Sequence, residues 1–178
     1  MIFRIIVVCI IVLSVTACQT FVTQNKSGKP VTGELIGYGL YSISSKSNSF
    51  PAQETASGKK NLARVALRLQ TTKVELKQGT VFGFEYILSN LPDTNKKLYL
   101  DTIVYHPKMI NAQGKAYYVS RYKQPMRPKN GVYKDSLTYS LSEEYEMVAG
   151  EWVFEIRYQD QPVISKKFSV RKNKGHKS

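Results

Sequence analysis

The chain has 178 residues, and its 26 Lys and Arg outnumber its 13 Asp and Glu, which gives a formal net charge of +13. A chain of this length can bury a core of its own, so it needs no disulfide or metal for stability. Because 42% of its residues are hydrophobic and 11% aromatic, the composition excludes a disordered or fibrous chain.

Residues 1–17 have the pattern of a secretory signal peptide. Arg4 precedes an apolar run from Ile5 to Leu13, and small or β-branched residues follow up to Ala17. A helix that spans a bilayer needs about 20 apolar residues, whereas polar sequence begins here at Gln19. The segment is therefore predicted to direct export and then to be removed. An uncleaved membrane anchor is the weaker alternative.

The sequence Val15-Thr16-Ala17-Cys18 resembles the lipobox of bacterial lipoproteins. The resemblance implies cleavage between Ala17 and Cys18, a diacylglycerol on the Cys18 thiol and an acylated amino group. Two or more acyl chains are needed for stable anchoring, because one alone holds only marginally. Enteric lipoproteins retained in the inner membrane carry Asp after the cysteine, so Gln19 favours the outer membrane. The alternative is an ordinary secretory signal that leaves Cys18 as a free thiol.

Residues 18–32 are predicted to be the lipidated cysteine and a flexible tether, since they contain Ser27, Gly28 and Pro30 and show no sustained period. Cys9, the other cysteine, would leave with the signal peptide. The mature domain then has no thiol for a disulfide, a zinc site or nucleophilic catalysis.

Residues 33–170 are predicted to form an all-β domain, an antiparallel sandwich of about 7–9 strands. Apolar and polar residues alternate in 63–70, 80–88, 97–107 and 151–158, with turn signals between them. The residues expected to face the core are Val65, Leu67, Leu69, Phe82, Phe84, Tyr86, Leu88, Leu98, Leu100, Val104, Trp152, Phe154, Ile156 and Tyr158. The Ser-rich stretch from Ser44 to Lys60 is predicted to be a surface loop, and Ser142 to cap one helical turn.

The closing hairpin is the clearest unit, because Trp152 to Tyr158 alternates and the returning strand brings Phe168 and Val170 to the same face. The segments 37–41, 70–88 and 146–170 resemble an uncharacterised family of bacterial domains of unknown function. The hairpin itself also resembles the last strands of immunoglobulin-like domains, which implies an immunoglobulin-like sandwich. Neither resemblance implies an activity, so no functional residue can be carried over.

Few residues suit catalysis or metal binding. His106 lies near a strand end, and Asp101, five residues earlier, points to the opposite face, so a half-buried structural histidine is the favoured interpretation. The carboxylates Glu143, Glu144 and Glu146 lack the spacing of a calcium loop and are predicted to form a solvated acidic turn. No cofactor or metal is expected.

The basic residues are concentrated, since no acidic residue occurs from Thr102 to Lys134. The predicted anion-binding surface in this span consists of Lys115, Tyr118, Arg121, Tyr122, Lys123, Arg127 and Lys129. The alternative is that loop lysines protect strand edges from pairing, and that the basic tail, residues 171–178, only aids solubility.

These features predict a lipid-anchored, periplasm-facing binding or structural protein of the bacterial envelope, in the outer membrane. Its expected partners are the membrane, through the anchor, and an anionic envelope polymer, a glycolipid or an envelope protein. Export argues against a nucleic acid partner. The alternative is an extracytoplasmic hydrolase of cell-wall or glycan substrates, with two carboxyl groups roughly 5–10 Å apart.

Overall fold

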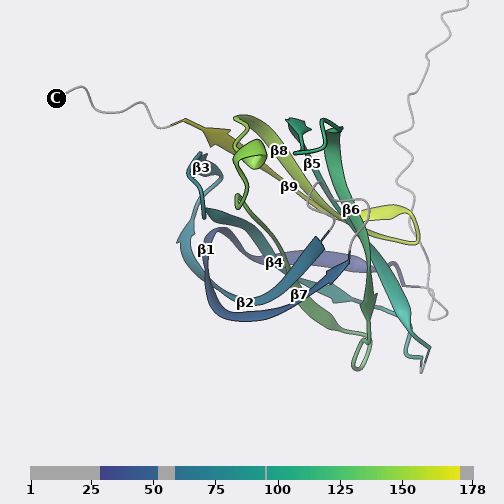
Figure 1. Ribbon diagram of the computed structural model, residues 1–178. Helices are drawn as coiled ribbons and strands as arrows, with labels where there is room; N and C mark the ends of the chain where they lie inside the picture. The colour runs from purple at the N-terminus through teal and green to yellow at the C-terminus, as the bar shows by residue number, and fades with distance from the viewer. Residues whose placement is uncertain (1–28, 52–58, 95, 173–178) are drawn as a thin grey trace, which may run out of the picture.

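Two sheets make up the fold (Figure 1). The computed structural model describes residues 29–51, 59–94 and 96–172, so the predicted signal peptide, Cys18 and the last tail residues lie outside it. The strands are β1 (Thr32–Pro51), β2 (Lys59–Gln70), β3 (Lys73–Glu75), β4 (Val81–Ser89), β5 (Leu98–Ile110), β6 (Ala116–Met126), β7 (Tyr133–Ser140), β8 (Gly150–Tyr158) and β9 (Gln161–Arg171). The prediction of an all-β sandwich of about 7–9 strands is confirmed.

The strand order is β2-β1-β4-β7 in the four-stranded sheet and β3-β9-β8-β5-β6 in the five-stranded sheet. The short strand β3 pairs with β9 in parallel, through Val74 and Val170, whereas the other strand pairs are antiparallel. The chain crosses from β2 to β3, and so between the sheets, within two residues. One parallel pair is thus the exception to the predicted antiparallel sandwich.

Aromatic side chains fill the space between the sheets. The ring of Phe82 on β4 lies edge-on to Trp152, Phe154 and Phe168 of the closing hairpin, with centroid distances of 5.4, 5.3 and 5.5 Å. Such pairs contribute about 0.5–1.5 kcal/mol beyond the area they bury. All four residues are at most 1% exposed. The predicted inward faces of β4 and β8 are therefore confirmed.

The hairpin of β1 and β2 departs from the prediction. The pair is long and strongly curved (Figure 1), and β2 is an edge strand, so Leu67 and Leu69 are 37% and 56% exposed instead of buried. Residues 44–51 and 59–60, predicted as a surface loop, are strand; the remainder of that loop, 52–58, lies outside the described residues. Backbone pairing with β1 outweighed the Ser-rich composition, which predicts loops only by correlation.

Glycine permits the bend of β1. Gly39 and Gly83 are paired across β1 and β4 with φ values of +141° and +152°. A Cβ at Gly83 would lie 2.1 Å from the carbonyl oxygen of Leu137. Only glycine adopts this backbone without strain, and it lets β1 leave β4 after Tyr41 and continue with β2 alone.

The loops form two groups at opposite ends of the sandwich. At the end where β1 begins, the Asn90 side-chain amide donates to the Pro30 carbonyl at 3.0 Å, and the Leu91 amide to the Gly131 carbonyl at 2.9 Å. We call residues 29–31, 90–94, 96–97, 127–132 and 159–160 the tether-end loops. The far-end loops, which include the 3₁₀ turn η1 (Glu144–Glu146), are residues 71–72, 76–80, 111–115, 141–149 and 172. Figure 1 shows the β8–β9 turn at the right and η1 near the top, beside the β8 label.

Candidate binding surface

The seven residues of the predicted anion-binding surface do not form one patch. Arg121 and Lys123 point outward from the five-stranded sheet on the edge strand β6, opposite Ile103 and Asp101 of β5. Tyr122, between them, points to the inner face, where burial raises the pKa of its hydroxyl. The other four are Tyr118, 57% exposed on β6, Lys115 in a far-end loop, and Arg127 and Lys129 in a tether-end loop.

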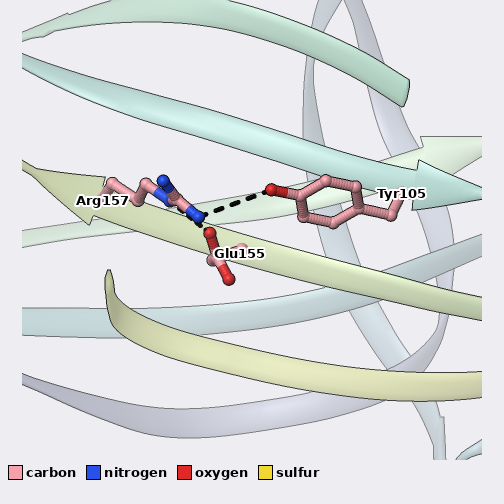
Figure 2. Close-up of polar contacts among 3 residues, drawn as sticks. All are labelled: Tyr105, Glu155 and Arg157. Atoms are coloured by element: carbon pink, nitrogen blue, oxygen red, sulfur yellow. Dashed lines mark hydrogen bonds and ion pairs between the residues drawn. The ribbon is translucent and has the colours of Figure 1, made fainter. Parts of the chain in front are cut away.

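The outer face of the five-stranded sheet carries an ordered polar row (Figure 2). Arg157 on β8 donates from Nε to the Glu155 carboxylate and from Nη2 to the Tyr105 hydroxyl of β5, the latter at 3.5 Å. The hydrogen bond to Glu155 raises the pKa of the Arg157 guanidinium above its ordinary value. Three side chains from two strands are thus held in one arrangement on the solvent side of the sheet.

Cations at the edge of this row are free to meet a ligand. Arg121 and Lys123 are exposed, and neither forms an ion pair within the described part of the chain. Between them and the row lies Ile103, which is fully buried although it points outward, because Arg121 and Glu155 stand opposite it on either side. The outer face is therefore a flat, packed layer with cations along one border.

The far-end loops contain a buried polar cluster that the sequence analysis missed. Glu146 is only 4% exposed; its carboxylate accepts hydrogen bonds from the Tyr139 hydroxyl at 2.8 Å and from the backbone amides of Ser142 and Glu143 at 2.8 and 2.9 Å. The prediction of a solvated acidic turn is therefore wrong for Glu146. The helical turn exists, but Glu143, not Ser142, is its N-cap residue, in a reciprocal capping box with Glu146.

His106 belongs to the same cluster and is buried within β5, not half-buried at its end. Its Nδ1 lies 2.8 Å from the Pro107 carbonyl oxygen, its Nε2 3.4 Å from the Ser120 hydroxyl, and its ring 5.3 Å from that of Trp152. Burial lowers the pKa of His106, partly offset by the hydrogen bond to Pro107. Because Ser120 is also buried, these side chains join the two strands β5 and β6 and offer no surface to a substrate.

A second polar cluster, around the buried Gln124, links β6 to β7. Gln124 donates to the Asp135 carboxylate and, at 3.0 Å, to the Tyr133 hydroxyl, which itself donates to Asp135 at 2.7 Å. Burial, followed by the contact with Asp135, raises the pKa of the Tyr133 hydroxyl. Period-two alternation alone places the half-buried Asp135 on the inner face opposite Tyr86, and this signal could have predicted the direction of its side chain.

The described residues contain no group of three His, Cys, Asp or Glu side chains close enough to hold a metal ion. No helix in the same residues is long and apolar enough to cross a bilayer. The hydrolase alternative needs two neighbouring carboxyl groups. Asp101 and Glu155 lie on the same outer face of the five-stranded sheet, but the Glu155 carboxylate is already ion-paired to Arg157.

A family model described as a domain of unknown function, DUF3859, matches residues 29–170. The chain belongs to the DUF3859 family. Residues 29–170 include all nine strands but for Arg171, the last residue of β9. None of the curated proteins matches this DUF3859 chain in sequence.

Among solved structures, the DUF3859 domain is similar to an immunoglobulin-like protein from Pseudomonas aeruginosa. The two are 23% identical with a TM-score of 0.54, over 80% of this chain and 98% of that one. This likeness confirms the immunoglobulin-like fold. Two further structures are more distant. An alkylpurine DNA glycosylase from Pseudomonas fluorescens is 12% identical with a TM-score of 0.42, over 56% of this chain and 28% of that one. A β-glucosidase from Listeria innocua is 11% identical with a TM-score of 0.37, over 80% of this chain and 16% of that one.

Proposed function

We propose that this DUF3859 protein is a lipid-anchored binding protein of the bacterial envelope, held in the outer membrane through Cys18. The immunoglobulin-like sandwich is consistent with a binding or structural role without catalysis. The lipobox Val15–Cys18 supports the lipid anchor, and Gln19 supports its location in the outer membrane. The ten residues Gln19–Gly28, which lie between Cys18 and the folded domain, could reach up to ~35 Å if fully extended.

The binding surface is the outer face of the five-stranded sheet, and its ligand is an anionic, sugar-containing envelope component. The observation that carries this is the row of Tyr105, Glu155 and Arg157 beside the exposed cations Arg121 and Lys123. The hydrophobic core does not require these side chains, because it is complete on the inner face. Arg and Lys bind phosphate or carboxylate groups, and an exposed ring such as Tyr99, 50% exposed on the same face, can pack against a sugar.

Mass spectrometry of the native protein tests the anchor. The expected product begins at Cys18 and carries the mass of its acyl chains, and Cys18→Ala releases the domain from membranes. Removal of Cys9 with the signal peptide leaves Cys18 as the one cysteine of the mature chain, so the assignment is unambiguous. An intact leader, or an unmodified thiol at Cys18, would contradict the anchor.

Binding to purified lipopolysaccharide and to its dephosphorylated form tests the surface. We expect the double variant Arg121→Glu with Lys123→Glu to weaken binding to the phosphorylated form by about tenfold or more, and the loss to shrink at high salt. The matched control is Lys77→Glu with Lys172→Glu, which reverses two exposed far-end charges. Equal binding by both double variants would remove the outer face from the proposal.

A further inference from the structure

The two ends of the sandwich carry different charge. The tether-end loops hold five cations, Lys29, Lys96, Lys97, Arg127 and Lys129, against two carboxylates, Asp93 and Asp160. The far-end loops hold three cations, Lys77, Lys115 and Lys172, against three carboxylates, Glu143, Glu144 and Glu146. Among the loop residues that the structure describes, the excess of positive charge therefore lies at the end from which the chain leads back toward Cys18.

The five tether-end cations are all exposed. They come from three loops that are far apart in the sequence, and hydrogen bonds tie these loops together: Asn90 to the Pro30 carbonyl, and Leu91 to Gly131. Lys97 also lies over the ring of Tyr99, with its Nζ 5.9 Å from the ring centroid. The fold thus gathers these charges, which are scattered in the sequence, at one end.

We propose that the tether-end loops dock on the anionic phospholipid headgroups of the membrane that holds the anchor. Each Lys or Arg near an anionic surface is attracted to it, and the attraction fades within a Debye length. Lys29 is eleven residues from Cys18, so the tether permits contact but cannot enforce it. The charges of the tether-end loops supply the attraction and hold the outer face of the five-stranded sheet upright, clear of the bilayer.

Charge, not apolar surface, distinguishes the docking end. Val132 and Tyr99 are 43% and 50% exposed near the tether end, but Ile110 and Tyr118 are at least as exposed toward the far end. A purely apolar attraction would therefore not choose between the ends. The inference rests on the proposed lipid anchor for its geometry, and its charge requirement can be tested separately.

The test uses the acylated full-length product in vesicles of phosphatidylcholine alone or mixed with phosphatidylglycerol. A fluorophore is attached to a new cysteine at Val132→Cys, in a tether-end loop, or at Ala112→Cys, in a far-end loop; both residues are exposed. Cys18 is blocked by its lipid, so labelling is specific. A nitroxide at the lipid headgroup quenches only a label at the surface.

We expect strong quenching of the Val132→Cys label in the anionic vesicles only, and weak quenching of the Ala112→Cys label in both. Arg127→Glu with Lys129→Glu should lower the ratio of docked to undocked protein at least about tenfold, since each charge contributes roughly a factor of five to this ratio. Lys77→Glu with Lys172→Glu should leave it unchanged. Quenching that is equal at the two labels, equal in the two lipids, or unaffected by Arg127→Glu with Lys129→Glu overturns the docking.

If Cys18 proves to carry no lipid, the proposed anchor is wrong, but docking of the tether-end loops on anionic lipid can still be tested. The Cys18→Ala protein with the same two labels is then mixed with the same vesicles. Salt-sensitive quenching of the Val132→Cys label alone supports the docking surface, and no quenching with anionic lipid rejects it.

Discussion

The two ends of the sandwich use charge in opposite ways. At the far end, Glu146 is turned inward, and its carboxylate satisfies the Tyr139 hydroxyl and two backbone amides of its own loop. At the tether end, the lysines and Arg127 are turned outward into solvent. The first arrangement stabilises a loop over the aromatic core, whereas the second leaves charge for a partner.

This difference follows from what each end must cover. The far-end loop 141–149 lies against Trp152, whose indole N–H donates to the Val148 carbonyl at 3.4 Å. A loop packed on the core buries backbone groups, and buried groups need partners. Side chains that keep their charges in water contribute little to folding. The comparison therefore predicts large stability effects at the far end and small ones at the tether end.

Trp152→Ala is expected to have the largest effect, a loss of about 3–5 kcal/mol in the free energy of unfolding. The indole is fully buried and lies 5.0 Å from the Tyr139 ring and 5.4 Å from the Phe82 ring, so truncation leaves a cavity. Denaturant unfolding measures the loss, with Trp152→Phe as the milder control. A loss below about 1 kcal/mol would contradict the position of Trp152 in the core.

Glu146→Gln comes next, with an expected loss of about 1.5–3 kcal/mol, the range for hydrogen bonds to a charged group. The amide has one acceptor oxygen in place of two, so either the Tyr139 hydroxyl or the two backbone amides lose their partner. Glu144→Gln is the matched control, because this neighbour is exposed. Equal effects at Glu144 and Glu146 would show that burial of Glu146 does not stabilise the loop.

Particular residues show what the sequence could predict. Alternation placed Phe82, Phe84, Trp152 and Phe154 correctly, because these central strands have a neighbouring strand at each edge and bury one face against the other sheet. Alternation failed for Leu67 and Leu69, because period two does not reveal that a strand lies at a sheet edge on a hairpin that leaves the sandwich. Backbone pairing between β1 and β2 is a long-range property and has no local signal.

The candidate surface shows the same limit. A run without acidic residues predicted one patch, but a strand alternates its faces, so Tyr122 turned inward while Arg121 and Lys123 turned outward. The partners of this surface, Tyr105 and Arg157, are 52 residues apart in the sequence. The burial of Glu146 depends on Tyr139 and on the path of the loop over the core, which no spacing rule contains.

The third prediction concerns pH at the far end. Burial lowers the pKa of His106 below its ordinary value of 6.5, so the unfolded chain takes up the proton first as the pH falls. The stability of the native state should therefore decrease as pH falls below about 6.5 toward the folded pKa. His106→Gln should flatten this part of the pH profile, and His176→Gln, at the other histidine, should not. A profile unchanged by His106→Gln would place the pH dependence elsewhere.

The smallest effect is expected at the tether end, for Arg127→Gln with Lys129→Gln. Both side chains are exposed, and Lys129 pairs with Val132 through backbone groups that the substitution retains. The free energy of unfolding should change by no more than about 0.5 kcal/mol, whereas attraction to anionic vesicles should fall. A loss comparable with that of Glu146→Gln would mean that these charges also stabilise a loop. The tether end would then resemble the far end, and its cations would no longer be available to a membrane surface.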